Sequence, residues 1–148
     1  MTVQEWFDAY GASHRHPTNK RIHAVCVPAI TVSLLALLSA LPVPGRNGWW
    51  HAGTWLFAGA LIFYARLSAS LAIGMAVLGV AALALIHALP GGAVVPWALA
   101  VFAAAWGGQF VGHRIEGAKP SFFRDLQFLL IGPLWLLADV YRRFAIPW

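Results

Sequence analysis

A run of 47 residues without a charged side chain, from position 67 to position 113, limits this chain more than any other feature. At roughly 20 residues for each crossing of a bilayer, the run is long enough for two transmembrane helices. The rest of the chain agrees, because 60% of its 148 residues are apolar and only 10% are charged. The sequence therefore predicts an all-α integral membrane protein with a single domain.

Four apolar segments are separated by turns rich in Pro, Gly and Asn, and they predict four transmembrane helices. Their approximate ranges are 22–41, 49–64, 68–89 and 97–112. A fifth apolar segment, 122–138, contains Asp125, Gln127 and a Gly132-Pro133 break, and basic residues flank it. We expect a re-entrant or half-buried helix pair there, because such a segment does not suit a full crossing.

The N-terminal segment carries apolar residues on one face of a helix. Val3, Trp6, Phe7 and Tyr10 follow the i, i+3, i+4, i+7 spacing. This pattern predicts a short amphipathic helix, which we expect to lie at the membrane surface. The single cysteine, Cys26, excludes an internal disulfide and is expected to be a small buried apolar residue.

Four crossings would place the N-terminus, the turn at position 66 and the C-terminal part on one side of the membrane. That side collects nine of the ten basic residues: Arg15, Lys20, Arg21, Arg66, Arg114, Lys119, Arg124, Arg142 and Arg143. Only Arg46 falls opposite, so the positive-inside rule makes the basic side the cytoplasmic face. Because the basic residues flank apolar spans, the net charge of +5 does not indicate a nucleic-acid partner.

The same topology brings two distant polar clusters to the cytoplasmic face. They contain His14, His16 and His23 in the first cluster and His113 and Glu116 in the second. The remaining histidines, His51 and His87, fall at the opposite face, where we expect interface residues.

Within each cluster, helical spacing places polar residues on a common face. Asn19 and His23 are four residues apart, and Gln109, His113 and Glu116 follow at spacings of four and three. Inward-pointing ionisable residues near a membrane usually serve a site, and imidazoles beside a carboxylate or an amide suit Fe(II) or Zn(II). Asn19, Gln109 and Glu116 would then orient the rings.

Each of these residues also has a purely structural interpretation. The histidines could cap helices or bond backbone carbonyls, and His16 in particular is expected to be an exposed neighbour or a helix cap. Glu116 could pair with Lys119 or Arg114 at the interface.

The polar clusters together resemble the fungal and bacterial 2-hydroxy fatty acid dioxygenase family of small multispan membrane proteins. The first motif, H-x-x-P-x-N-x-x-x-H-x-x-x-x-P, runs from His14 to Pro28. The second, Q-F-V-G-H-x-x-E-x-x-x-P, runs from Gln109 to Pro120, and Gly132-Pro133 follows. The resemblance covers nearly the whole chain, with departures at Cys26 or Val27, where many relatives have Gly, and at Asp139, where an acidic Glu is usual.

The resemblance implies an Fe(II)-dependent enzyme of fatty acid α-oxidation in a membrane, for this chain a bacterial inner membrane with the site at its cytoplasmic face. Its substrates would be O₂ and a long-chain 2-hydroxy fatty acid, and its product a fatty acid one carbon shorter. Carried over by motif, the catalytic residues are His14, Asn19, His23, His113 and Glu116, of which His14, His23, His113 and Glu116 would hold the metal. We expect the substrate-binding residues to be Lys20, Arg21, Gln109, Arg114 and Lys119.

Two other functions remain open from the sequence. The first is a metal-dependent membrane lipid hydrolase in which Glu116 is the base that activates a metal-bound water. The second is a structural or assembly membrane protein without enzymatic activity, whose histidines only cap helices. A haem protein is a weaker third alternative.

Overall fold

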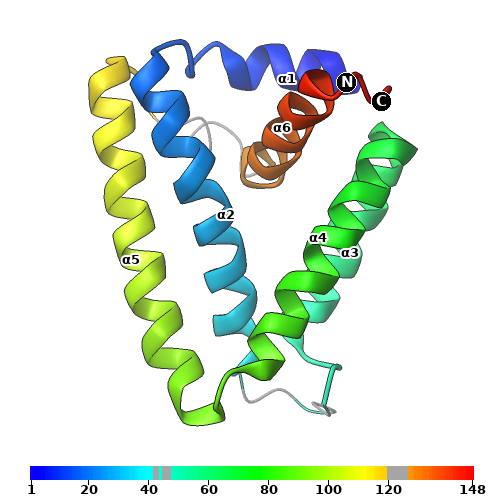
Figure 1. Cartoon of the computed structure of the whole chain (residues 1–148), viewed down its shortest axis with the longest axis vertical. Coiled ribbons are helices and arrows are strands. Elements are labelled where there is room, and N and C mark those ends of the chain that lie inside the picture. Colours follow the sequence, from blue (N-terminus) through cyan, green and yellow to red (C-terminus); the bar gives the residue numbers. More distant parts are fainter. Residues whose placement is uncertain (42–43, 45–47, 120–126) are drawn as a thin grey trace.

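The computed structural model describes residues 1–41, 44, 48–119 and 127–148. Within these ranges the chain forms six helices (Figure 1): α1 (Val3–Gly11), α2 (Pro17–Ser39), α3 (Ala52–Leu67), α4 (Ala69–Ala88), α5 (Gly91–Glu116) and α6 (Phe128–Arg143).

Helices α2 and α5 lie side by side, and α3 and α4 form a second antiparallel pair (Figure 1). The two pairs diverge toward the end of the molecule that carries both termini. There α1 lies across the bundle and α6 lies between the pairs (Figure 1). One apolar core joins α1, α3, α4 and α6, and a second joins α2, α4 and α5.

Among the described residues, three helices are long and apolar enough to cross a membrane, namely α2, α4 and α5. The predicted count of four spans is not established, because α3 has only 16 residues and is about 24 Å long. The hydrocarbon core of a bilayer is about 30 Å thick. In the described residues, the helical architecture and the length and apolar composition of these three helices agree with the sequence.

The boundary predicted for the last long helix is wrong. Position 97 was expected to be its start because Pro90 and Pro96 enclose a glycine-rich turn. Instead α5 begins at Gly91 and carries Pro96 inside its N-terminal part. It ends where Gly117 adopts a left-handed conformation with φ +72°, which glycine tolerates without steric cost.

The predicted break at Gly132-Pro133 is also wrong. Helix α6 runs without interruption from Phe128 to Arg143 and contains Pro133. Gly132 is buried and lies against the Tyr10 hydroxyl of α1. The glycine therefore allows two helices to approach closely.

Asp125 and the start of the predicted 122–138 segment lie outside the described residues, as do Arg46, Pro120 and Arg124.

Helix α1 has the apolar face that the sequence predicted, but this face packs on protein. Trp6, Phe7 and Tyr10 are buried. The ring of Trp6 makes edge contacts with Phe63 and Phe128, at centroid distances of 6.4 and 5.5 Å. A capping box between Thr2 and Glu5 fixes the start of the helix. The helix therefore closes one end of the bundle with its apolar face packed on the other helices.

Candidate metal centre

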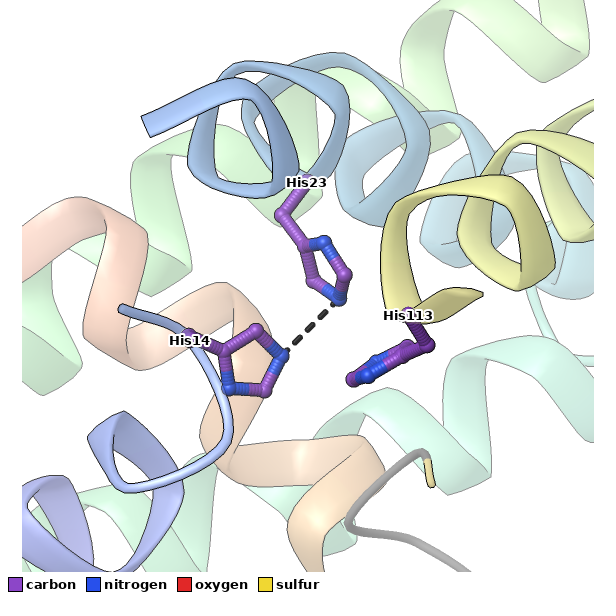
Figure 2. Close-up of side chains that lie close together, drawn as sticks. All are labelled: His14, His23 and His113. Carbon is purple, nitrogen blue, oxygen red and sulfur yellow. Dashed lines mark hydrogen bonds between the residues drawn. The ribbon is translucent and has the colours of Figure 1, made fainter. Parts of the chain in front are cut away.

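Three buried imidazoles from three separate parts of the chain meet at this end of the bundle (Figure 2). His14 lies in the link between α1 and α2, His23 in the second turn of α2, and His113 in the last turn of α5. One nitrogen of each ring lies within 4.8 Å of the others. The two polar clusters of the sequence thus meet around one point, as their shared side of the membrane led us to expect.

Local structure explains why two of these histidines reach the same place. His16 caps the N-terminus of α2, with its ring accepting a hydrogen bond from the Thr18 backbone N–H at 3.2 Å. Pro17 occupies the first turn, where its missing N–H costs nothing. The helix therefore starts three residues after His14, and its second turn places the ring of His23 next to the ring of His14, at a centroid distance of 4.3 Å.

Backbone carbonyls hold two of the rings by their Nδ1 atoms. His14 Nδ1 lies 2.6 Å from the Tyr10 carbonyl oxygen, and His23 Nδ1 lies 3.0 Å from the Asn19 carbonyl oxygen. Because a carbonyl oxygen only accepts, each Nδ1 carries the hydrogen. The Nε2 atom of each neutral ring is then left with a free lone pair.

The Nε2 lone pairs of His14 and His23 face each other and not a hydrogen-bond donor. The Nε2 atoms of His14 and His23 are 2.9 Å apart. Within the described residues, the buried Nδ1 of His113 has no hydrogen-bond partner. Burial lowers the pKa of His14 to about 4, so a shared proton is disfavoured at neutral pH. Three neutral imidazole donors fit a divalent cation such as Fe(II) or Zn(II).

Glu116 lies outside the group of three imidazoles. Its carboxylate joins two distant segments of the chain, and we call this contact the Glu116 clamp. Its carboxylate accepts hydrogen bonds from the backbone N–H groups of Arg15 and His16, each at 2.8 Å, and from Asn19 Nδ2 at 3.0 Å. These three hydrogen bonds favour a positioning role for Glu116, and its role as a fourth metal ligand stays a prediction. The carboxylate ties the link that carries His14 to the end of α5.

Asn19 connects the clamp to the imidazoles. Its backbone carbonyl holds His23, and its side-chain amide donates to Glu116. The side chain is fully buried against Gly112 of α5, where a Cβ atom would overlap Asn19 Oδ1. Asn19 therefore sets the distance between α2 and α5 as well as the orientation of His23.

A cavity of about 50 Å³ opens beside the imidazoles. Its lining combines the three histidines and Gln109 with mainly apolar residues of α2 and α6. The lining residues are Tyr10, His14, His23, Val27, Ile30, Thr31, Trp106, Gln109, His113, Phe128, Leu129 and Gly132.

Of the residues expected to bind substrate, only Gln109 lines this cavity. Lys20, Arg21, Arg114 and Lys119 are exposed and outside the lining. Steering of an acidic substrate by these four cations stays a prediction.

The other histidines have structural contacts elsewhere. His51 caps α3 by accepting a hydrogen bond from the Thr54 backbone N–H at 3.2 Å. Its ring lies 5.7 Å from the ring of the exposed His87, at the end of the bundle opposite the metal centre.

Two features of the site escaped the sequence analysis. Tyr10 was assigned only to the apolar face of α1, yet its ring stacks on His14 at a centroid distance of 4.1 Å. The spacing of four residues between them was the available signal. The second feature is the pair Gly108 and Gly112, a G-x-x-x-G spacing that typically lets membrane helices pack closely.

Comparison with known families agrees with this geometry. A family model described as 2-hydroxy-palmitic acid dioxygenase Mpo1-like matches residues 1–144. The chain belongs to the Mpo1-like family. The match includes all three histidines of the metal centre and the Glu116 clamp. No curated protein and no solved structure matches the chain.

Proposed function

We propose that this chain is an Fe(II)-dependent dioxygenase that shortens long-chain 2-hydroxy fatty acids by one carbon. The observation that carries the proposal is the group of three buried imidazoles, which have ligand atoms within 4.8 Å of one another and line a cavity. The description of the family to which the chain belongs names a 2-hydroxy-palmitic acid dioxygenase, which supports the substrate class and the use of O₂.

The proposed reaction breaks the bond between C1 and C2 of the acid. The 2-hydroxy acid R–CH(OH)–COOH and one O₂ give R–COOH, CO₂ and water, so that C2 is oxidised and O₂ is reduced. His14, His23 and His113 would hold the Fe(II), which would supply the redox chemistry.

The chain's own residues prepare this site. The carbonyl groups of Tyr10 and Asn19 fix the tautomer of His14 and His23, so both rings present a lone pair. The apolar lining residues, including Val27, Ile30 and Leu129, would surround the reacting carbons and limit their contact with water. The cavity has room for a few water-sized groups, so the acyl chain would extend along the helices into lipid.

The two other functions considered from the sequence have less support. A hydrolase with Glu116 as base needs a free carboxylate, whereas this carboxylate accepts three hydrogen bonds. Histidines that only cap helices are present, as His16 and His51 show, but the three clustered imidazoles cap none of the described helices.

The proposal is tested by purifying the protein without oxygen, measuring its metal content and adding 2-hydroxyhexadecanoic acid with ¹⁸O₂. We expect one iron per chain, uptake of O₂ and a labelled C15 acid. His23→Ala should lose iron and activity, whereas the matched control His87→Ala should keep both. A protein without iron that makes no shortened acid would remove the proposal, and an oxygen-independent product would favour the hydrolase.

A further inference from the structure

We propose that the Tyr10 hydroxyl and the Gln109 carboxamide bind the head group of the substrate, and that this neutral pair recognises its 2-hydroxyl group. The inference rests on the proposed function and extends it to the residues that select the substrate.

Both side chains are buried polar groups that line the cavity. Tyr10 and Gln109 are each 5% exposed. Within the part of the chain that the structure describes, neither the Tyr10 hydroxyl nor the Gln109 carboxamide forms a hydrogen bond with another residue. The side-chain polar atoms that the described chain buries without a partner are Asn19 Oδ1 and His113 Nδ1, so the Tyr10 hydroxyl and the Gln109 carboxamide keep surface that faces the cavity. A ligand in the cavity can therefore form hydrogen bonds with both groups.

The two groups reach the cavity from different helices, next to the metal centre. The Tyr10 ring stacks on His14, with an interplanar angle of 14°. Gln109 lies on α5 four residues before His113 and shares its face. A ligand at the imidazoles is therefore within the space that both side chains line.

Gly132 of α6 provides the room that this arrangement needs. A Cβ atom at this position would lie 2.9 Å from the Tyr10 hydroxyl oxygen. The cavity of about 50 Å³ admits a few water-sized groups. It therefore suits a carboxylate with its neighbouring carbinol carbon.

The hydrogen-bonding capacity of the pair matches a 2-hydroxy acid. A tyrosine hydroxyl donates to a carboxylate, while a glutamine side chain both donates and accepts, so its oxygen can take the hydrogen of a substrate hydroxyl. No Lys, Arg, Asp or Glu is among the residues that line the cavity in the described chain. Recognition by neutral groups disfavours an acid without the 2-hydroxyl, because such an acid leaves a buried polar group unpaired.

The test measures binding without oxygen, so that no turnover occurs. Iron-loaded wild type, Tyr10→Phe and Gln109→Leu are titrated with 2-hydroxyhexadecanoic acid and with hexadecanoic acid. Tyr10→Phe keeps the ring that stacks on His14, and neither variant removes an imidazole, so iron content should stay at the wild-type value.

We expect each variant to bind the 2-hydroxy acid about 10-fold more weakly than wild type, the loss of one hydrogen bond to a polar ligand. Gln109→Leu should also narrow the preference for the 2-hydroxy acid over hexadecanoic acid. The matched control is Tyr64→Phe, which removes a buried hydroxyl that bonds the Leu130 carbonyl at 2.8 Å, away from the cavity. It should keep wild-type affinity.

Unchanged affinity in iron-loaded Tyr10→Phe and Gln109→Leu would overturn the inference while leaving the proposed function intact. If Gln109→Leu does not load iron, Gln109→Asn takes its place, because the shorter amide should also weaken binding. A wild type that binds both acids equally would also overturn the inference, whereas one that takes up no iron would remove the proposed function and the inference with it.

Discussion

His14 and His23 each donate a hydrogen bond from Nδ1 to a backbone carbonyl. Their Nε2 atoms therefore face each other as possible metal ligands. Their Nε2 atoms are 2.9 Å apart, and each carries a lone pair if both Nδ1 atoms donate. Without a cation between them, this arrangement is repulsive. A cation bound between the two Nε2 atoms would remove this repulsion.

Metal binding should accordingly raise the stability of the protein. We expect Fe(II) or Zn(II) at 100 times its Kd to stabilise the fold by about 2.7 kcal/mol, because the folded state binds it and the unfolded chain does not. Thermal unfolding in detergent with and without metal measures this shift. Mg²⁺ is the control, since it prefers oxygen ligands. An equal shift in His14→Ala would show that the ion binds elsewhere.

Glu116 gives the second prediction at this scale. In Glu116→Gln, the side-chain amide would face at least one of the three N–H donors that now bond the carboxylate. We expect a loss of about 1–3 kcal/mol in unfolding free energy. We also expect metal affinity to fall by about 10–100-fold with unchanged stoichiometry.

Metal titration of the purified variant gives the affinity, and the absorption spectrum of the Co(II)-loaded variant reports the coordination sphere, so the two together separate this positioning role from that of a ligand. If Glu116 were a ligand, Glu116→Gln would alter the coordination sphere and not only the affinity. Glu5→Gln is the control, because this carboxylate belongs to the capping box of α1 and is exposed.

The sequence could predict the histidines of the site but not the partners of Glu116. The four-residue spacing of Asn19 and His23 and the shared end of the helices are visible in the chain. Two of the three Glu116 donors are backbone N–H groups of Arg15 and His16, however. Backbone donors have no residue signature, so only the fold reveals that the carboxylate is already engaged.

At the scale of the helix, α2 and α5 approach each other where α5 has no side chains. A Cβ atom at Gly108 would lie 2.6 Å from Cys26 Sγ, and one at Gly112 would overlap Asn19 Oδ1. This contact brings His23 and His113 within reach of one ion. Close packing of the helix pair and the closeness of His23 and His113 therefore depend on the same two glycines.

Gly112→Ala should separate the helices and weaken the site. We expect a loss of about 1–3 kcal/mol from overpacking, together with weaker metal binding, because Asn19 must move. Unfolding in detergent and metal titration measure the two effects. Gly107→Ala is the matched control on the same helix, since nothing lies within 4 Å of a Cβ at that position. Equal behaviour of the two variants would contradict this account of the packing.

The element predictions failed where proline was taken as a boundary. Pro96 and Pro133 both lie inside helices. Proline removes one backbone hydrogen bond and kinks a helix, but membrane helices tolerate it when neighbouring groups compensate. The hydrophobic pattern was the more reliable signal, because burial in lipid or protein stabilises the helix over its whole length.

Across the whole molecule, the basic residues gather at the end that carries the termini and the metal centre. In the described chain they are Arg15, Lys20, Arg21, Arg66, Arg114, Lys119, Arg142 and Arg143, and all lie at or next to the helix ends found there (Figure 1). The opposite end carries the α2–α3 and α4–α5 connections. By the positive-inside rule, we propose that the metal centre faces the cytoplasm.

Cysteine labelling tests this orientation in a Cys26→Ser background. Gly91→Cys places a thiol at the start of α5, and Lys119→Cys places one just beyond its end. Since α5 has 26 residues and is about 39 Å long, it can separate these positions across a bilayer. A membrane-impermeant maleimide should label Gly91→Cys in intact cells and Lys119→Cys only after the membrane is opened. The reverse pattern would place the metal centre outside, and labelling of both in intact cells would show that α5 does not cross.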